Sequence, residues 1–244
     1  MEREQEWLER TRLIYGAENL DKLRNARIAV FGIGGVGGYA VEALARSGVG
    51  ALDLFDGDTV AASNLNRQIT ATVRSIRRNK VDVMKERILE INPEARVNAR
   101  VFFFLPANSH EIDFSQFDYI IDAIDTIAGK IELVIKSREA GAAIISAMAA
   151  GNKVDPAAFE VADIYDTQIC PISRVMRREL RRRGIERLKV VYSKEPPVAP
   201  REIISSGGKR QVPGSNAFVP AAAGLIIAGE VVRDIIKVSK KFTE

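Results

Sequence analysis

RIAVFGIGGVG, residues 27–37, decides the fold of this chain. The β-branched and apolar side chains at 27–31 indicate a buried strand, and YAVEALARSG at 39–48 has helical spacing. The turn between them contains Gly32, Gly34, Gly35 and Gly37. A strand that passes through a glycine turn into a helix directs backbone N–H groups and the positive helix end toward one point. The stretch therefore predicts a phosphate-binding turn in an α/β fold.

Strands and helices alternate downstream of this turn. Further strands are predicted at 51–56, 95–104, 117–123 and 142–148, and helices at 39–46, 80–91 and 130–140. The strand ALDLFD does not alternate between apolar and polar residues, which is typical of a parallel strand buried on both faces. The pattern predicts a Rossmann-like, doubly wound, mostly parallel sheet with helices on both faces.

The flanking segments complete a predicted single domain, 1–244. Its parts are N-terminal helices at 1–24 with a turn at Tyr15 and Gly16, a nucleotide-binding core at 25–160, a basic helix and mobile loop at 161–217, and a C-terminal helix at 218–240. The third part contains a short strand near 154–164, a basic helical insertion at 170–184, a strand at 187–193 and a loop rich in Pro, Gly and Ser at 194–217. The last helix is apolar on most faces, so we expect it to be buried.

Composition restricts the location and the type of site. Cys170 is the single cysteine, which excludes an internal disulfide framework and a CxxC zinc site and fits a reducing cytoplasm. The charged N-terminus has no apolar core of a signal peptide, and no stretch is apolar enough to predict membrane insertion. The net charge of +4 mildly favours an anionic partner.

The glycine turn by itself leaves the nucleotide open. Gly32, Gly34 and Gly37 satisfy the dinucleotide pattern G-x-G-x-x-G, and Asp56 follows at the end of the next strand, where a carboxylate can accept ribose hydroxyls. An NAD-dependent oxidoreductase therefore fits the turn as well as an ATP-dependent enzyme does. The oxidoreductase interpretation leaves residues 58–80 unexplained.

Residues 55–68, FDGDTVAASNLNRQ, carry a more specific signal. Together with GIGGVG before them, and Lys80 and IDAIDT (121–126) after them, they resemble the ThiF/MoeB-type adenylating enzymes. The pattern is a G-x-G-G-x-G turn, D-x-D-x-V, S-N-L-x-R-Q, a following lysine and a later D-x-x-D, and the chain has every element. The resemblance covers roughly residues 12–150 and implies ATP as the nucleotide.

Charge assigns roles within this pattern. ATP carries about four negative charges, and an attacking carboxylate adds repulsion, so cations must neutralise the phosphates. Arg67 offers a planar fork and Lys80 a point charge, while Asp125 can hold Mg²⁺ against the phosphates. The resemblance implies that Asn64 lines the phosphate site and that Arg12 reaches the ATP of a partner subunit in a homodimer. The predicted nucleotide-binding residues are Gly32, Gly34, Gly35, Gly37, Asp56, Asp58, Asn64, Arg67, Gln68 and Lys80.

Further stretches narrow the resemblance. RLIYG at 12–16, ALARSGVGALDLFD at 43–56, INPEARV at 91–97, IIDAIDT with Lys130, and GNKVDPAAFEVADI at 151–164 are similar to the tRNA threonylcarbamoyladenosine dehydratases. The similarity implies that ATP activates the threonine carboxylate of N6-threonylcarbamoyladenosine in tRNA, with pyrophosphate released first. The acyl-adenylate then cyclises and AMP leaves, a net loss of water that benefits from intramolecular ring closure.

The basic helix fits a nucleic-acid substrate. It carries the predicted tRNA contacts Arg174, Arg177, Arg178, Arg181 and Arg182, and Arg183, Arg187 and Lys189 follow them. Only two acids, Glu179 and Glu186, lie among these bases, so the helix predicts a phosphate-binding surface rather than a balanced solvated face.

Several alternatives stay open at this point. One is adenylation of the C-terminal glycine of a ubiquitin-like sulfur carrier, and another is a nucleotide-sensing module without turnover. Cys170 precedes Pro171 at a loop–helix junction, where it is either a thioester-forming residue or a tolerated small residue, the latter being favoured. A sulfur-transfer partner is left open. So is an alkali-metal site near 146–155, because SAMAAG replaces a more glycine-rich turn of the longer family members.

Overall fold

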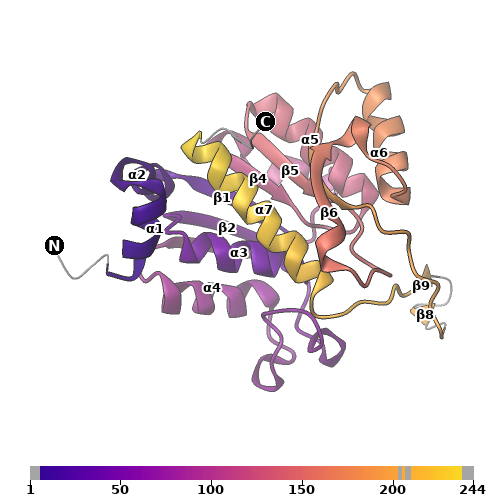
Figure 1. Ribbon diagram of the computed structural model, residues 1–244, viewed down its shortest axis with the longest axis horizontal. Helices are drawn as coiled ribbons and strands as arrows, with labels where there is room; N and C mark the ends of the chain where they lie inside the picture. The colour runs from indigo at the N-terminus through magenta and orange to yellow at the C-terminus, as the bar shows by residue number, and fades with distance from the viewer. Residues whose placement is uncertain (1–5, 203–204, 207–209, 238–244) are drawn as a thin grey trace.

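A seven-stranded sheet forms the centre of the computed structural model, which describes residues 6–202, 205–206 and 210–237 (Figure 1). The strand order is β3-β2-β1-β4-β5-β7-β6, and every neighbouring pair is parallel except β6 with β7. The strands are β1 (Arg27–Phe31), β2 (Ala51–Asp56), β3 (Arg96–Val101), β4 (Tyr119–Asp122), β5 (Ala143–Ala147), β6 (Phe159–Asp163) and β7 (Lys189–Ser193). The chain order reverses between β1 and β4, and such a switch point is where open α/β sheets bind ligands.

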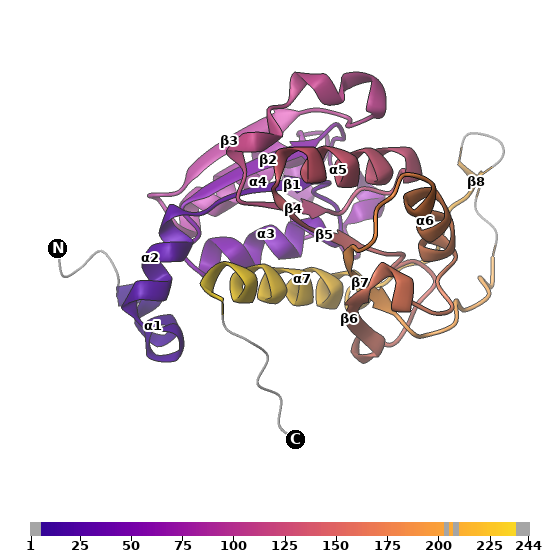
Figure 2. The same ribbon diagram turned by 90° about the horizontal axis from the view of Figure 1, so that it is seen from above.

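Helices cover both faces of the sheet, as predicted. One face packs against α3 (Gly37–Arg46), α4 (Lys80–Ile91) and α7 (Val219–Ile236), and the other against α5 (Ile127–Ala140) and α6 (Pro171–Arg182). Figure 2 shows α3 and α7 on one side of the strands and α5 on the other. The doubly wound α/β prediction is confirmed. None of the described helices is long and apolar enough to cross a membrane.

The two faces have different cores. Aliphatic side chains of β1, β2 and β4 pack against α3, α4 and α7, whereas the opposite face carries a cluster of aromatic rings. Phe31 of β1 stacks on Phe55 of β2 with ring centroids 4.4 Å apart, and Phe104 and Phe114 pack against Phe31 from the loops that follow β3. Every residue of β2 is buried, as the lack of apolar–polar alternation in its sequence predicts.

Several predicted boundaries coincide with the structure and others do not, since α5 begins at Ile127 and not at 130. The predicted elements at 27–31, 51–56 and 80–91 match β1, β2 and α4. The predicted strand at 95–104 is wrong at its end, because β3 stops at Val101. Phe102 and Phe104 leave the sheet to join the aromatic cluster, so their apolar run reflects packing rather than strand pairing.

The remaining elements surround the sheet. Near the N-terminus lie η1 (Glu6–Leu8), α1 (Glu9–Tyr15) and α2 (Ala17–Asn25). Gly16 separates α1 from α2, and its φ of +81° matches the turn predicted there. Short 3-10 helices occupy connections: η2 (Ala62–Asn64), η3 (Val73–Ser75), η4 (Pro106–Glu111), η5 (Phe114–Gln116), η6 (Pro156–Ala158) and η7 (Ile164–Asp166). The predicted loop at 194–217 contains a small hairpin of β8 (Ser205–Ser206) and β9 (Arg210–Gln211). Its residues 203–204 and 207–209, and the predicted helical residues 1–5 and 238–240, lie outside the described residues.

Candidate active site

A pocket of about 440 Å³ lies at the carboxyl ends of β1, β2 and β4, at the switch point of the sheet. It brings together most of the predicted site residues, namely Gly32, Gly34, Gly35, Asp56, Asp58, Asn64, Arg67, Gln68, Lys80 and Asp125. Gly37 and Arg12 are not among its lining residues. The structure thus brings residues from Gly32 to Asp125 to one pocket, and their chemical roles stay predictions.

Backbone packing explains the glycines of the turn. Gly32 has a φ of +90°, and a Cβ there would lie 2.6 Å from the carbonyl oxygen of Ala123. A Cβ on Gly37 would lie 1.8 Å from the carbonyl oxygen of Gly32, so Gly37 closes the turn instead of lining the pocket. Around Gly34 the nearest atom to such a Cβ is Gln68 Nε2, at 3.8 Å. Gly34 therefore leaves open space toward the pocket, where a phosphate can approach the backbone.

Asp56 joins the glycine turn to the end of β2. Its Oδ2 accepts the Ile33 N–H at 2.7 Å, and its Oδ1 accepts the Asp58 N–H at 2.8 Å. Burial raises the pKa of Asp56 above its usual value, although Lys80 and the two backbone donors act in the opposite direction. Each carboxylate oxygen keeps a second lone pair. The predicted contact with ribose hydroxyls fits this arrangement and stays a prediction.

Two cations reach the pocket from different elements. Lys80 is the first residue of α4, and its Nζ lies 2.7 Å from Asp58 Oδ2 and 3.9 Å from Asp56 Oδ1. Arg67 follows η2, and its Nη1 donates to the carbonyl oxygen of Ser63 and to Asn66 Oδ1, both at 2.8 Å. Both cations line one cavity whose glycine turn supplies backbone donors, which is a suitable environment for a polyphosphate.

Asn64 organises the loop that carries Arg67. Its Oδ1 accepts the Ala61 N–H at 3.0 Å, and its carbonyl oxygen accepts the N–H groups of Arg67 and Gln68. Gln68 is buried, and among the described residues its Oε1 has no hydrogen-bond partner. An unpartnered buried oxygen beside the glycine turn indicates a site that a ligand or water completes.

The two carboxylates of the D-x-x-D pattern have different environments. Asp122 is fully buried at the end of β4, where Lys130 Nζ lies 3.0 Å from its Oδ1 and the Ser146 hydroxyl donates to its Oδ2. Asp125 is exposed, lines the pocket and has no ion-pair partner among the described residues. Asp122 therefore fixes β4 against α5 and β5, whereas Asp125 lies at the pocket without an ion pair among the described residues.

One wall of the pocket escaped sequence reasoning. Ala150, Gly151 and residues 212–215 also line the cavity, and Pro220 reaches it from the first turn of α7. A Cβ on Gly35 would lie 3.1 Å from Pro220 Cβ, so α7 presses directly on the glycine turn. Residues 194–217 are predicted as a loop without a site residue, and that prediction is wrong for residues 212–215 of the pocket wall. The dipeptide Pro213-Gly214, which is typical of a turn, is the one local signal in this segment.

The other predicted functional residues lie outside the pocket. Arg12 is exposed on α1, next to Leu13 and Ile14, whose exposed fractions are 85% and 77%. Cys170 is 4% exposed and precedes α6, so the favoured interpretation of a buried small residue fits better than an accessible thioester cysteine.

The basic helix α6 presents most of its predicted contacts to solvent. Arg174, Arg178, Arg181 and Arg182 are exposed. Arg177 is half-buried, and its Nη1 donates to the Thr167 carbonyl oxygen at 2.9 Å, so this arginine also holds the loop before the helix. The guanidinium of Arg181 lies 5.0 Å from the ring centroid of Tyr165.

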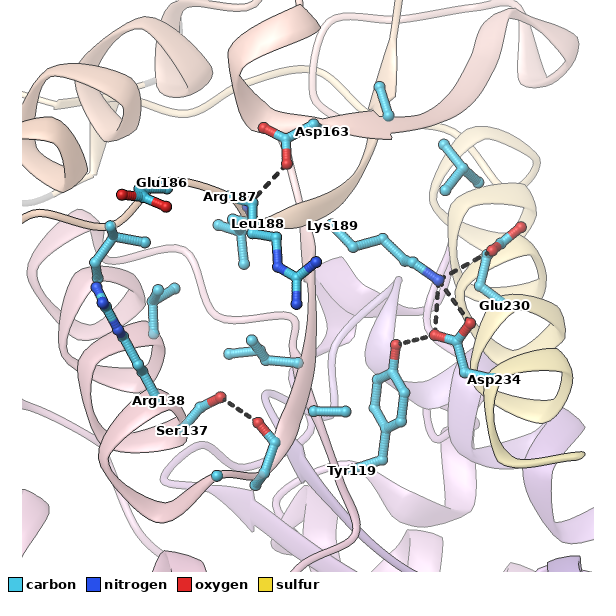
Figure 3. A pocket seen from close by; sticks show the side chains of 18 of the residues that line it. Tyr119, Ser137, Arg138, Asp163, Glu186, Arg187, Leu188, Lys189, Glu230 and Asp234 are labelled. Atoms are coloured by element: carbon cyan, nitrogen blue, oxygen red, sulfur yellow. Dashed lines mark hydrogen bonds and ion pairs between the residues drawn. The ribbon is translucent and has the colours of Figure 1, made fainter. Parts of the chain in front are cut away.

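A second, larger pocket of about 980 Å³ lies at the amino ends of β4, β5 and β7 (Figure 3). Lys189 Nζ lies 2.7 Å from Asp234 Oδ2 there, and the Tyr119 hydroxyl donates to the same carboxylate at 2.6 Å. Burial and this hydrogen bond raise the pKa of Tyr119. The pocket lies at the opposite edge of the sheet from the glycine turn, and its acids and bases are mixed. Its network fastens α7 to the sheet and does not resemble a phosphate site.

Comparison with known proteins decides the family. The model of the ThiF family matches residues 8–243, which include both the glycine turn and the D-x-x-D carboxylates.

The chain belongs to the ThiF family.

The most informative relatives of this ThiF-family chain carry one name. This chain is 42% identical over 238 residues to the Bacillus subtilis tRNA threonylcarbamoyladenosine dehydratase, and the match covers 93% of this chain and 94% of that protein. The crystal structure of the E. coli tRNA N6-threonylcarbamoyladenosine dehydratase, TcdA, in complex with AMP superposes with a TM-score of 0.86 at 32% identity, covering 96% and 95% of the two chains. The ATP complex of the same E. coli protein gives 0.84 at 31% identity with the same coverage.

Proposed function

We propose that this chain uses ATP to adenylate the threonyl carboxylate of N6-threonylcarbamoyladenosine in tRNA, and so catalyses its dehydration and cyclisation. The observation that carries the proposal is the convergence of Arg67, Lys80 and Asp125 on one pocket beside the glycine turn. The near full-length similarity to dehydratases of this name supports the substrate. A dinucleotide oxidoreductase would leave all three charges without a function.

The geometry suggests how the chain promotes the first step. A carboxylate oxygen of the substrate attacks the α-phosphorus of ATP, a new O–P bond forms, and the bond to the β-phosphate oxygen breaks to release pyrophosphate. Arg67 and Lys80 offset the negative charge that accumulates around the phosphates. The N–H groups of the glycine turn add donors that cost no reorganisation during the reaction.

The second step needs no nucleophile from the protein. A nucleophilic atom of the threonylcarbamoyl group attacks the activated carbonyl carbon, the bond between that carbon and the AMP oxygen breaks, and AMP leaves with the electron pair. The proton lost by the nucleophile, the proton lost when the carboxylic acid ionises, and the carboxylate oxygen retained by AMP together account for the net loss of one water. The protein contributes by holding the two reacting parts of one substrate close together.

Mg²⁺ fits the carboxylate of Asp125. Among the described residues, no group of three or more His, Cys, Asp or Glu side chains could enclose a metal ion. Mg²⁺ commonly takes only one or two carboxylates and completes its shell with phosphate oxygens and water, so one exposed aspartate in the pocket suits it. The ion would supply charge neutralisation at the phosphates.

Two predicted partners belong to this proposal. The exposed arginines of α6 would bind the phosphate backbone of tRNA without reading its sequence. Arg12 would act in a homodimer, since it lies on α1 away from the pocket of its own chain and beside the exposed Leu13 and Ile14.

We also propose that residues 1–244 form one domain with the parts predicted above. The sulfur-transfer partner and the cytoplasmic location stay predictions.

The decisive experiment compares acceptors. Purified protein is incubated with ATP and Mg²⁺, with and without tRNA that carries N6-threonylcarbamoyladenosine, and AMP and pyrophosphate are measured. We expect both products only with modified tRNA, together with the loss of one water from the nucleoside by mass spectrometry. Arg67→Ala and Asp125→Asn should each lower AMP formation by at least about 10²-fold, the cost of removing one preorganised charge contact.

Other outcomes would select other functions. Product formation that requires a sulfur-carrier protein with a C-terminal glycine would overturn the tRNA proposal in favour of the carrier alternative. Oxidation of NADH would overturn adenylation altogether. Turnover at the wild-type rate in either variant would remove the role assigned to that residue.

A further inference from the structure

Residues 212–216, called the strap below, close one side of the nucleotide pocket. In Figure 1 they run from β9 back to the start of α7. Val212, Pro213, Gly214 and Ser215 line the cavity, and Ser215 contacts the loop that carries Arg67. A segment from late in the sequence is thus placed against a phosphate site that is built from early segments.

Asn152 holds the middle of the strap, at Gly214. Its N–H donates to the Gly214 carbonyl oxygen at 2.8 Å, and its Oδ1 accepts the Gly214 N–H at 2.6 Å. Its own carbonyl oxygen accepts the Val198 N–H at 2.8 Å. One residue therefore binds both the outgoing and the returning arm of the excursion between β7 and α7. Its φ of +56° is a left-handed conformation that asparagine adopts more readily than most residues.

Asn66 binds the next residue of the strap from the loop that carries Arg67. Its Nδ2 donates to the Ser215 carbonyl oxygen at 3.1 Å, while its Oδ1 accepts Arg67 Nη1 at 2.8 Å. A side-chain amide has its donor and its acceptor on opposite sides, so the strap contact determines the direction in which Oδ1 points. Asn66 occupies the unspecified position of the S-N-L-x-R-Q pattern, so the contact is a property of this chain.

We propose that Asn66 and Asn152 are positioning residues, which act through the strap to hold the Arg67 guanidinium in its catalytic orientation. The inference rests on the proposed function, because it takes Arg67 to act at the α-phosphate. Arg67 retains a second anchor at the Ser63 carbonyl oxygen, so losing the strap contact misdirects the guanidinium without releasing it.

Three substitutions separate the contacts. Asn66→Ala removes both the strap bond and the Arg67 bond, whereas Asn66→Asp keeps an acceptor for Arg67 and loses the donor to Ser215. Asn152→Gly removes the side-chain acceptor and keeps the left-handed backbone, which glycine adopts freely. Asn98→Ala is the matched control, since Asn98 donates to Asp53 from β3 and does not line the pocket.

The expected signature is a split between kcat and KM. Each of the three variants should lower kcat for AMP formation by about tenfold to a hundredfold, the range expected for a small displacement of a positioned group. The KM for ATP should change by less than about threefold, and the melting temperature by less than about 2 °C, since an exposed contact is removed. Asn98→Ala should retain the wild-type kcat.

A double-mutant comparison tests whether the asparagines act through Arg67. In an Arg67→Lys background, which keeps a charge but loses the planar fork, Asn66→Ala should cause no further loss of kcat. An additive loss there, or a kcat equal to the wild type in Asn66→Asp and Asn152→Gly, would overturn the inference while the proposed function stands. If the wild-type protein forms no AMP with modified tRNA, the proposed function fails and this inference fails with it.

Discussion

Lys80 Nζ lies 2.7 Å from Asp58 Oδ2, in an ion pair whose lysine side chain is 7% exposed and whose aspartate is 62% exposed. The cation is therefore fixed inside the nucleotide pocket, while its partner reaches it from solvent. An incoming phosphate can replace Asp58, because the exposed carboxylate returns to water while the phosphate keeps the buried ammonium compensated. The pair keeps the buried ammonium compensated until a nucleotide binds.

This asymmetry predicts unequal effects of removing the two partners. Lys80→Met should lower kcat/KM for ATP by at least about 10²-fold, since it removes a charge contact to the reacting phosphates. Asp58→Asn should change the KM for ATP by less than about fivefold, because the bound phosphate, and not Asp58, then compensates Lys80. Steady-state kinetics with saturating tRNA measures both. Equal losses in the two variants would show that Asp58 itself contacts the nucleotide.

The glycine turn predicts a contrast between neighbouring substitutions. A Cβ at position 34 projects into open pocket space, whereas one at position 37 would collide with the Gly32 carbonyl oxygen at 1.8 Å. Gly34→Ala should keep the melting temperature of the wild type and weaken ATP binding by about tenfold or more, because the methyl group occupies phosphate space. Gly37→Ala should unfold at a lower temperature. Calorimetric titration with ATP and thermal denaturation distinguish the two, and normal ATP binding by Gly34→Ala would contradict the assignment.

The buried Glu42 should stabilise the fold in a pH-dependent way. It lies buried on α3, where it accepts hydrogen bonds from Arg87 of α4 and from Arg46. Burial favours the protonated acid, but the hydrogen bonds from the two arginines outweigh it and lower the pKa of Glu42. Because the folded-state pKa is lowered, this stabilisation is complete above the ordinary value of about 4.3 and is lost as the pH falls through the lower folded-state value.

Urea denaturation of Glu42→Gln tests this linkage. At pH 7 the substitution should lower the free energy of unfolding by about 1 to 2 kcal/mol, a range reduced because both arginines are partly exposed. The difference from the wild type should shrink as the pH falls below about 4. Glu86→Gln, which breaks an exposed pair with Arg78, is the control with a near-neutral effect. A loss that is independent of pH would show that packing, not charge, carries the effect.

The basic helix predicts a charge-specific loss of RNA binding. Arg178→Glu combined with Arg182→Glu should weaken tRNA binding by about tenfold at low salt, with a smaller loss as salt rises, and should leave the KM for ATP unchanged. Lys85→Glu combined with Arg96→Glu alters the net charge equally on exposed residues of α4 and β3, and should have little effect. Filter binding across a salt series measures both. Unchanged tRNA affinity of the α6 variant at moderate salt would contradict this surface.

Local patterns in the sequence predicted the parts of the fold that depend on local chemistry. Strands β1 and β2 are mostly apolar without alternation because parallel strands are buried on both faces, and α4 ends where Asn92 and Pro93 interrupt it. Asp56, Arg67, Lys80 and Asp125 could be placed in one site because each follows or begins an element at the same edge of the sheet.

The rest depends on contacts between distant residues, which no local pattern contains. The bond from Asn66 to Ser215 joins residues 149 positions apart, and the bond between Asn152 and Gly214 joins residues 62 positions apart. Both involve ordinary loop residues with no periodicity. Asp122 is a different case, since its motif alone could not tell a buried structural carboxylate with Lys130 from one that faces the pocket.

The packing of α7 has a consequence for the order of folding. A Cβ on Gly224 of α7 would lie 2.3 Å from the carbonyl oxygen of Val36, so the last described helix is seated directly on the backbone that cradles phosphate. Contacts this far apart in sequence form late, because a long loop must close before they stabilise anything. The glycine turn should thus reach its final conformation only when α7 packs against it, so ATP affinity should report completed folding.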